Sequence, residues 1–262
     1  MYRITEMIGK LMGWCPCQET VSAAQPGKSD HDTGSGGRNG LLMIRWSRLA
    51  MIGIVALAFL IGVTVYPTMP DEIPSHWNAA GEVDDYLPAF WGVFLLPILL
   101  AGVAVLFLFV VPALDARVEA TAEAGKRYDA FGLVTTLFLF AVYVSTILWA
   151  QGIEVSMSAF LAVSFGIMEI AMGFLMKKGL EQNSFVGIRT PWTLADERVW
   201  QITHERAGVA FQVAGILTLL TAAAPEVYGF VLLVMILAVV CIYLIWYSRQ
   251  VYQRVVRRSE IR

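Results

Sequence analysis

The chain has 262 residues, of which 57% are hydrophobic and only 15% are charged, and its formal net charge is -2. Soluble domains carry about 25% charged residues, so this composition argues against a soluble domain. The apolar residues also fall in blocks close to the ~20 residues that a helix needs to cross the hydrocarbon of a bilayer. We therefore expect an all-α integral membrane protein.

The residue types that usually carry catalysis or bind a metal are sparse and scattered. The sequence contains no H-E-x-x-H, no G-x-S-x-G and no phosphate-binding glycine loop, which are the common local signatures of such sites. Cys15, Cys17 and Cys241 give no disulfide framework, and no second ligand pair accompanies the first two at zinc-site spacing. We expect no enzyme, no metal, no cofactor and no direct contact with nucleic acid.

In chain order, residues 1–40 form a tail rich in Gly, Ser and Asp, with a short interfacial helix near its start. Two units follow. Residues 41–114 hold two spans and the loop 67–89, and residues 115–262 hold four spans and the polar loop 176–206. The predicted spans are 49–66, 90–111, 131–150, 156–176, 207–224 and 228–247. Residues 112–130 favour a helix that continues out of the membrane.

The positive charges support this division into six spans. The chain has 19 Lys and Arg residues, and all of them fall in the N-terminal segment, the second loop, the fourth loop or the C-terminal tail. The first, third and fifth loops hold none. Because Lys and Arg accumulate on the cytoplasmic side, we expect a multi-pass protein of the cell membrane with both termini in the cytoplasm.

The first loop is therefore expected outside the cell. Its residues Asn78 to Gly81 predict a turn between two short extended pieces, which would form a small β-hairpin. The loop is acidic, and His76 with its five acids offers a cation site as an alternative to solvated loop residues.

The polar stretch from Asn183 to Gly208 is the most distinctive part of the chain. Thr190 followed by Pro191 predicts a helix start, with threonine as the cap and proline at the first helical position. Thr193 with Asp196 gives a second possible start, close to a capping box. One face of the amphipathic helix that follows is then expected to comprise Val199, Trp200, Thr203 and Ala207.

Within this stretch, GIRTPWTL followed by VW and TH resembles the signature loop of the SdpI family of bacterial membrane proteins. The matching residues are Asn183, Phe185, Gly187, Ile188, Arg189, Thr190, Pro191, Trp192, Thr193, Leu194, Val199, Trp200, Thr203, His204 and Gly208. The outer loop resembles a two-span domain of unknown function that commonly precedes this family's block. Its matching residues are Pro70, Ile73, Pro74, His76, Trp77, Asn78, Gly81, Asp84 and Tyr86.

The resemblance implies a non-enzymatic immunity or signal-transduction protein that protects the membrane from a peptide toxin. In the family, such a protein can also hold a cytosolic repressor at the membrane. The implied partner-binding residues are Asn183, Gly187, Arg189, Thr190, Pro191, Trp192, Thr193, Trp200, Thr203 and His204. The implied sensing loop comprises Pro74, His76, Trp77, Asn78, Gly81, Asp84 and Tyr86.

Simpler roles remain open for some of these residues. Trp192 and Trp200 could instead anchor the chain at the membrane interface, and Arg198 could contact lipid headgroups. The partners that the sequence implies are thus the bilayer, a peptide toxin outside and a cytosolic regulator inside, with the oligomeric state left open.

Glu169 supports a different function. It is the one acidic residue well inside a predicted span, where an ionisable side chain is costly to bury. Gly166, Gly173 and Ala162 share its helix face, so a neighbouring helix can approach closely there, and Gln212 and Thr136 are its candidate hydrogen-bond partners. The alternative function is a transporter, or a channel for small solutes or protons, that uses Glu169.

Overall fold

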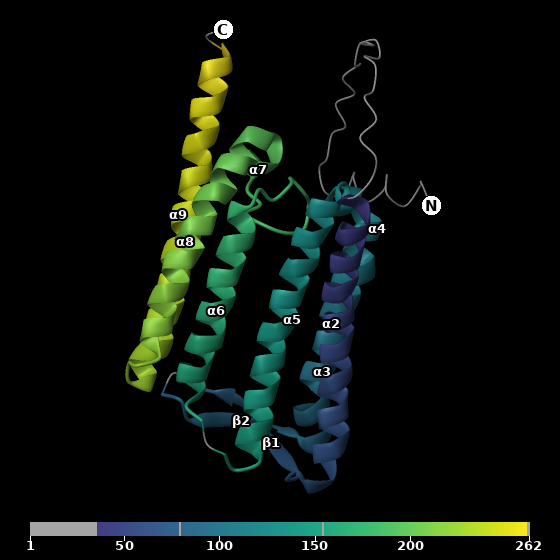
Figure 1. Cartoon of the computed structure of the whole chain (residues 1–262). Coiled ribbons are helices and arrows are strands. Elements are labelled where there is room, and N and C mark those ends of the chain that lie inside the picture. Colours follow the sequence, from purple (N-terminus) through teal and green to yellow (C-terminus); the bar gives the residue numbers. More distant parts are fainter. Residues whose placement is uncertain (1–35, 79, 154, 261–262) are drawn as a thin grey trace, which may run out of the picture. The chain divides into compact units, whose positions relative to one another are not determined.

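The computed structural model describes residues 36–260, apart from residues 79 and 154, as an antiparallel helical bundle with a small sheet at one end (Figure 1). The predicted interfacial helix, Cys15 and Cys17 lie outside the described residues. The elements are α2 (Gly36–Val65), β1 (Glu72–Trp77), β2 (Val83–Pro88), α3 (Ala89–Val105), α4 (Val111–Leu114), α5 (Ala122–Ala150), α6 (Met157–Lys177), α7 (Pro191–Ala195), α8 (Glu197–Thr221) and α9 (Glu226–Glu260).

Among the described residues, five helical segments are long and apolar enough to cross a membrane. They agree with the first, second, third, fourth and sixth predicted spans, and they are Trp46–Thr68, Ala89–Leu114, Ala122–Ala150, Met157–Lys177 and Val227–Val255. Two helices extend past the predicted ends. α2 begins at Gly36, inside the predicted tail, and α9 continues to Glu260, through most of the predicted C-terminal tail.

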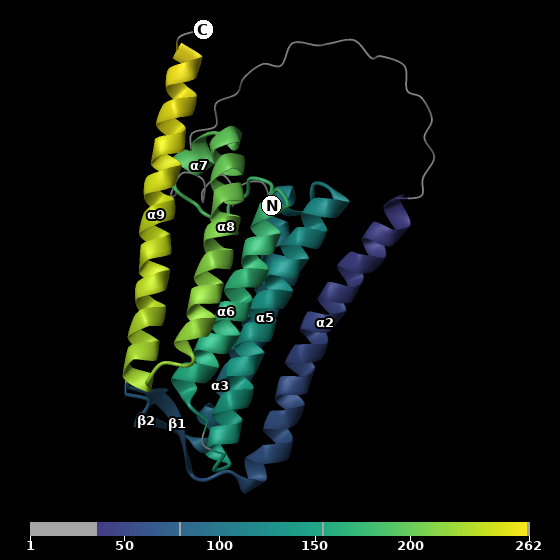
Figure 2. The same ribbon diagram turned by 60° about the vertical axis from the view of Figure 1, so that its left-hand side comes forward.

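The predicted fifth span lies in α8, which is not among these five segments. The first ten residues of α8 include four charged side chains, Glu197, Arg198, Glu205 and Arg206. Its uncharged part, from Ala207 to Thr221, is roughly 22 Å long at 1.5 Å per residue, against about 30 Å of hydrocarbon. The sixth crossing therefore stays a prediction, although α8 packs along α6 and α9 in both ribbon views (Figure 2).

The predicted hairpin is present. β1 and β2 pair antiparallel, and the side chain of Asn78 accepts hydrogen bonds from the backbone N–H groups of Ala80 and Glu82. Gly81 completes the turn with φ of 80°, a conformation that glycine adopts without strain.

The two predicted units share packing. One core cluster joins Ala58 of α2, Ile73 of β1, Val93 and Leu100 of α3, and Tyr143 of α5. Ile73 is fully buried, and a side chain at Gly92 would collide with it. The hairpin is therefore seated on the start of α3.

Helices α6 and α8 approach each other closely at two glycine pairs. A Cβ atom on Gly166 would lie 2.8 Å from the carbonyl oxygen of Gly215, and one on Gly173 would lie 2.6 Å from that of Gly208. The predicted small-residue face beside Glu169 is thus where another helix packs.

The segment between α4 and α5 is not the continuous helix that its composition favours. Asp115 adopts an extended conformation, and a short 3-10 turn at Ala116–Glu119 follows it. The side chain of Thr121 then caps the start of α5 by accepting from the N–H of Ala124. Two capping residues therefore override the helix propensity of the Ala and Glu residues around them.

Candidate functional site

The candidate site is the loop between α6 and α8, residues 178–196, together with the first turns of α8. It lies at the opposite end of the bundle from the β-hairpin (Figure 1). We call it the signature loop.

The predicted helix start at Thr190 is confirmed, but the helix is short. Thr190 and Thr193 form a reciprocal capping box at the start of α7, with Pro191 at its first position. Thr193 is therefore the third helical residue and not a second start. Asp196 caps α8 by accepting from the N–H groups of Arg198 and Val199, so two helices replace the single amphipathic helix that we expected.

His204 holds the loop against α8. Its Nε2 accepts a hydrogen bond from the N–H of Ile188 at 2.8 Å, and its Nδ1 lies 2.8 Å from the carbonyl oxygen of Trp200. A carbonyl only accepts, so Nδ1 carries the proton and the ring is neutral. Burial lowers the pKa of His204 to about 4, although the Trp200 carbonyl favours the charged form. The neutral ring is thus the form that the fold requires.

Trp200 is buried beside this histidine. Its ring stacks on His204 with centroids 4.0 Å apart, and its Nε1 donates to the carbonyl oxygen of Leu180 at 2.6 Å. The indole is fully buried, so the alternative of an interface anchor is wrong for Trp200.

Gly187 is required by this packing. Its φ of 112° lies where residues with a side chain are strained. A Cβ atom there would also collide with Nε2 of His204. The conformation and the contact exclude larger residues independently.

The loop is also fixed to the segment before α5. The side chain of Asn183 accepts from the N–H groups of Phe185 and Val186, and the carboxylate of Asp115 accepts from the N–H of Ser184 at 2.9 Å. Arg117 binds the same carboxylate at 2.8 Å. Burial raises the pKa of Asp115, but these hydrogen bonds outweigh it and hold the pKa below its usual value.

A third attachment reaches the last helix. The hydroxyl of Thr190 donates to that of Ser248 in α9 at 3.1 Å, and both residues are buried. Beside this contact lies an open hollow of about 450 Å³, whose lining includes Ile188, Arg189, Trp192 and Leu244.

Burial divides the ten predicted partner-binding residues. Six are buried and build the loop, and they are Asn183, Thr190, Thr193, Trp200, Thr203 and His204. Arg189 and Pro191 are exposed, whereas Gly187 and Trp192 are half-buried. Among the described residues Arg189 makes no hydrogen bond or ion pair, while Arg198 binds Asp196 at 2.8 Å.

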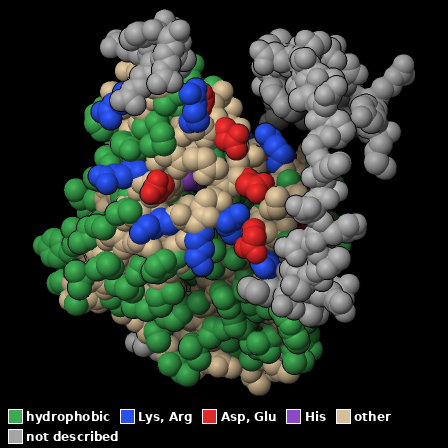
Figure 3. Space-filling model, turned by 45° about the horizontal axis from the view of Figure 1, so that its top comes forward, with side chains coloured by type: hydrophobic (Ala, Val, Ile, Leu, Met, Phe, Trp, Pro, Cys, Tyr) green, Lys and Arg blue, Asp and Glu red, His purple; other side chains and the backbone are tan. Residues whose placement is uncertain are grey.

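The charges of this end are mixed in sign. Figure 3 shows Lys, Arg, Asp and Glu side chains gathered there, with apolar side chains covering the flanks below them. Exposed apolar residues lie among these charges, including Phe185, Leu194 and Ile202.

The predicted sensing residues lie on and around the hairpin. His76 and Asp84 face each other across the strands, with Nδ1 and Oδ1 2.5 Å apart. Tyr86 is exposed, Trp77 is half-buried against Trp149 of α5, and Pro74 is buried. The described residues contain no group of three or more potential metal ligands at this or any other place.

Glu169 is buried, but its partner differs from our prediction. The hydroxyl of Thr218 in α8 donates to Oε2 of Glu169 at 2.7 Å. Thr136 instead donates to the carbonyl oxygen of Gly132 in its own helix. Oε1 of Glu169 and Nε2 of Gln212 are both buried without a hydrogen-bond partner among the described residues.

Several contributors to the site escaped the sequence reading. Asp115 and Arg127 come from the segment before α5 and its first turns, and Arg127 donates to the carbonyl oxygen of Lys178 at 2.6 Å. Gln182 donates to the carbonyl oxygens of Thr193 and Leu194. In the sequence, the one local sign of this helix break was an aspartate, Asp115, among residues that favour helices, because aspartate favours caps over helix interiors.

Comparison with known proteins matches two parts of the chain. Residues 179–248 match the model of the SdpI/YfhL protein family, and residues 53–101 match a domain of unknown function, DUF1648. The chain is also 28% identical over 188 residues to the immunity protein SdpI of Bacillus subtilis (strain 168), which covers 70% of this chain and 86% of that protein.

No solved structure matches the chain. The two matched segments are those in which the signature loop and the β-hairpin lie. Both parts of the resemblance found in the sequence are therefore confirmed: the chain is a multi-pass membrane protein that is similar to the immunity protein SdpI, and the residues that match the SdpI/YfhL model follow those that match DUF1648.

Proposed function

We propose that this chain is a non-enzymatic immunity protein of the cell membrane, which protects its host from a membrane-active peptide toxin. The similarity to the immunity protein SdpI over most of both chains carries the proposal. The arrangement of the signature loop supports it, because a rigid, buried framework there presents a small number of exposed side chains.

The proposal assigns one role to the hairpin and another to the signature loop. The hairpin, with the His76–Asp84 pair and its exposed acids, meets the toxin on the outer side. The signature loop then presents Arg189, Pro191 and Trp192 to a cytosolic regulator, which it holds at the membrane. A guanidinium that pairs with no described residue is suited to a partner's carboxylates, which it can bind through two parallel hydrogen bonds.

The proposal is tested by complementation. The chain is expressed in Bacillus subtilis lacking its own SdpI, and survival is measured in the presence of toxin-secreting cells of that species. We expect survival well above that of cells with an empty vector. Normal membrane abundance without any protection would contradict the immunity function.

The regulator is sought separately, by affinity capture on the detergent-solubilised protein. We expect wild type to retain a cytosolic protein that Arg189→Lys loses. Equal retention by both would contradict the role of Arg189, whatever the outcome of complementation.

One observation favours a second candidate, a transporter or a channel for small solutes or protons. Glu169 is buried in the bundle with one carboxyl oxygen free of any described hydrogen-bond partner, as expected of a group that gains and loses a proton. If Glu169 carries the proton, Glu169→Gln is expected to be as stable as wild type but to lose transport activity. A Glu169→Leu variant with the stability and activity of wild type would contradict this candidate.

A further inference from the structure

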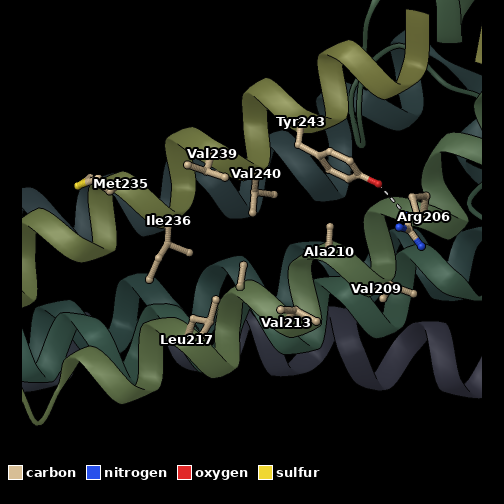
Figure 4. Close-up of a pocket in the computed structure, with 11 residues that line it drawn as sticks. Arg206, Val209, Ala210, Val213, Leu217, Met235, Ile236, Val239, Val240 and Tyr243 are labelled. Atoms are coloured by element: carbon tan, nitrogen blue, oxygen red, sulfur yellow. Dashed lines mark hydrogen bonds between the residues drawn. The ribbon is translucent and has the colours of Figure 1, made fainter. Parts of the chain in front are cut away.

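Helices α8 and α9 diverge enough to leave an apolar groove between them (Figure 4). Its volume is about 430 Å³, within the range of small-ligand pockets. Ala214 forms its buried floor, and its rim consists of exposed apolar side chains, among them Val213, Leu217, Met235 and Val239.

One cation stands at the end of this groove nearest the signature loop. Nε of Arg206 donates to the hydroxyl of Tyr243 at 2.7 Å, and the guanidinium carbon lies 6.0 Å from the centre of that ring. Arg206 makes no ion pair with any described acid. Its neighbour in the chain, Glu205, points about 100° around the helix. The remaining guanidinium nitrogens are thus available to an anion.

The length and position of the groove match one leaflet. From Arg206 to Leu217 the helix rises roughly 17 Å at 1.5 Å per residue, close to half of the hydrocarbon thickness of about 30 Å. Arg206 directly precedes the uncharged part of α8, which places the cation at the level of the headgroups.

We propose that this groove is a binding site for one anionic phospholipid of the leaflet nearest the signature loop. One acyl chain lies between α8 and α9, and the phosphate accepts hydrogen bonds from Arg206, which Tyr243 holds in place. A transmembrane helix of a toxin or of a second copy fits less well, since it would extend across both leaflets whereas the groove spans one.

The test uses the purified full-length protein, stripped of lipid in detergent, and native mass spectrometry. Phosphatidylglycerol and phosphatidylcholine with identical acyl chains are titrated separately. We expect wild type to retain one phosphatidylglycerol at a several-fold lower concentration than phosphatidylcholine. Arg206→Gln should abolish this preference. Val213→Trp and Val239→Trp, which fill the groove from exposed positions on opposite sides, should lose both lipids.

Arg254→Gln is the matched control, because Arg254 is an exposed cation of α9 outside the groove. It should bind both lipids as wild type does, and thermal unfolding should show that all the variants are folded. Retention of the preference in Arg206→Gln would overturn the proposal. So would unchanged lipid binding in both tryptophan variants.

Discussion

His204 is neutral because one of its ring nitrogens donates a hydrogen bond and the other accepts one. Nδ1 donates to the carbonyl oxygen of Trp200, and Nε2 accepts from the N–H of Ile188. Protonation of Nε2 would break the contact with Ile188 and would place a charge among buried groups. The imidazole therefore acts as a fixed hydrogen-bond bridge between α8 and the signature loop.

This role predicts a pH dependence of stability. The pKa of His204 falls from 6.5 to about 4 on folding, so the unfolded chain binds the proton first. Stability is complete above pH 6.5 and decreases as the pH falls toward 4, by a total of roughly 3 kcal/mol. We expect thermal unfolding of wild type to lose stability over this range relative to His204→Gln, which cannot titrate there. Parallel pH profiles for the two would contradict the bridge.

Gly187→Ala tests the same contact from the other side. The new alanine would have to adopt a strained positive φ, at a cost of about 1–3 kcal/mol. Its methyl group would also collide with the ring of His204. Gly152→Ala is the matched control, because Gly152 has φ of 84° and no atom within 4 Å of the added Cβ. Unfolding should show a larger loss at Gly187, and equal losses would mean that the collision is relieved without cost.

For single residues, the sequence predicted those features that depend only on neighbouring residues in the chain. The Thr190–Pro191 helix start and the buried face of Val199, Trp200 and Ala207 follow from capping and periodicity alone. The partner of Glu169 could not be predicted in this way, because it depends on how α6 packs against α8, which places Thr218 beside Glu169 and Gln212 beside Gly173. The burial of His204 depends likewise on Ile188, sixteen residues earlier in the chain.

Among the elements, the α6–α8 pair depends on close backbone approach. Glycines at this contact remove the side chains that would otherwise separate the helices, as small residues commonly do in membranes. The same approach brings Thr218 within hydrogen-bond distance of Glu169. The packing of one helix pair thus determines the environment of the buried carboxyl.

Gly166→Ala should therefore be strongly destabilising. Its Cβ atom would meet the backbone oxygen of Gly215, which cannot move as a flexible side chain can. Gly102→Ala serves as the control, because Gly102 is exposed on α3 with no atom within 4 Å of the added Cβ. We expect a loss of a few kcal/mol at Gly166 and almost none at Gly102. Similar unfolding midpoints for both variants would contradict the close contact.

Hydropathy predicted where the long apolar helices lie, because each span needs enough apolar residues to cross the bilayer, but it did not predict how far α2 and α9 extend beyond their spans. Helix propensity failed at the segment between α4 and α5, where Asp115 and Thr121 interrupt a run of good helix formers. It also missed the break at Asp196. In both places, side chains that accept hydrogen bonds from backbone N–H groups outweigh the average helix propensity of their neighbours.

For the whole molecule, the sorting of charges makes the orientation testable. A reporter that is active only in the cytosol should give signal after Ala124, Gln182 or Ser259, and none after Ala80, Gly152 or Glu226. The expectation follows from the positions of all 19 Lys and Arg residues. Fusions on either side of α8 decide whether its short uncharged part crosses the membrane. One reversed loop would overturn the six-span topology.

We propose that the buried framework of the signature loop presents the exposed Arg189 and the half-buried Trp192 to a partner, and that these two residues carry the function. The most direct measurement is toxin survival, together with membrane abundance, of cells expressing Arg189→Lys or Trp192→Ala. We predict normal abundance with a clear loss of protection for both, because lysine cannot form paired hydrogen bonds and alanine removes the indole contact. Full protection by both variants at normal abundance would contradict the claim.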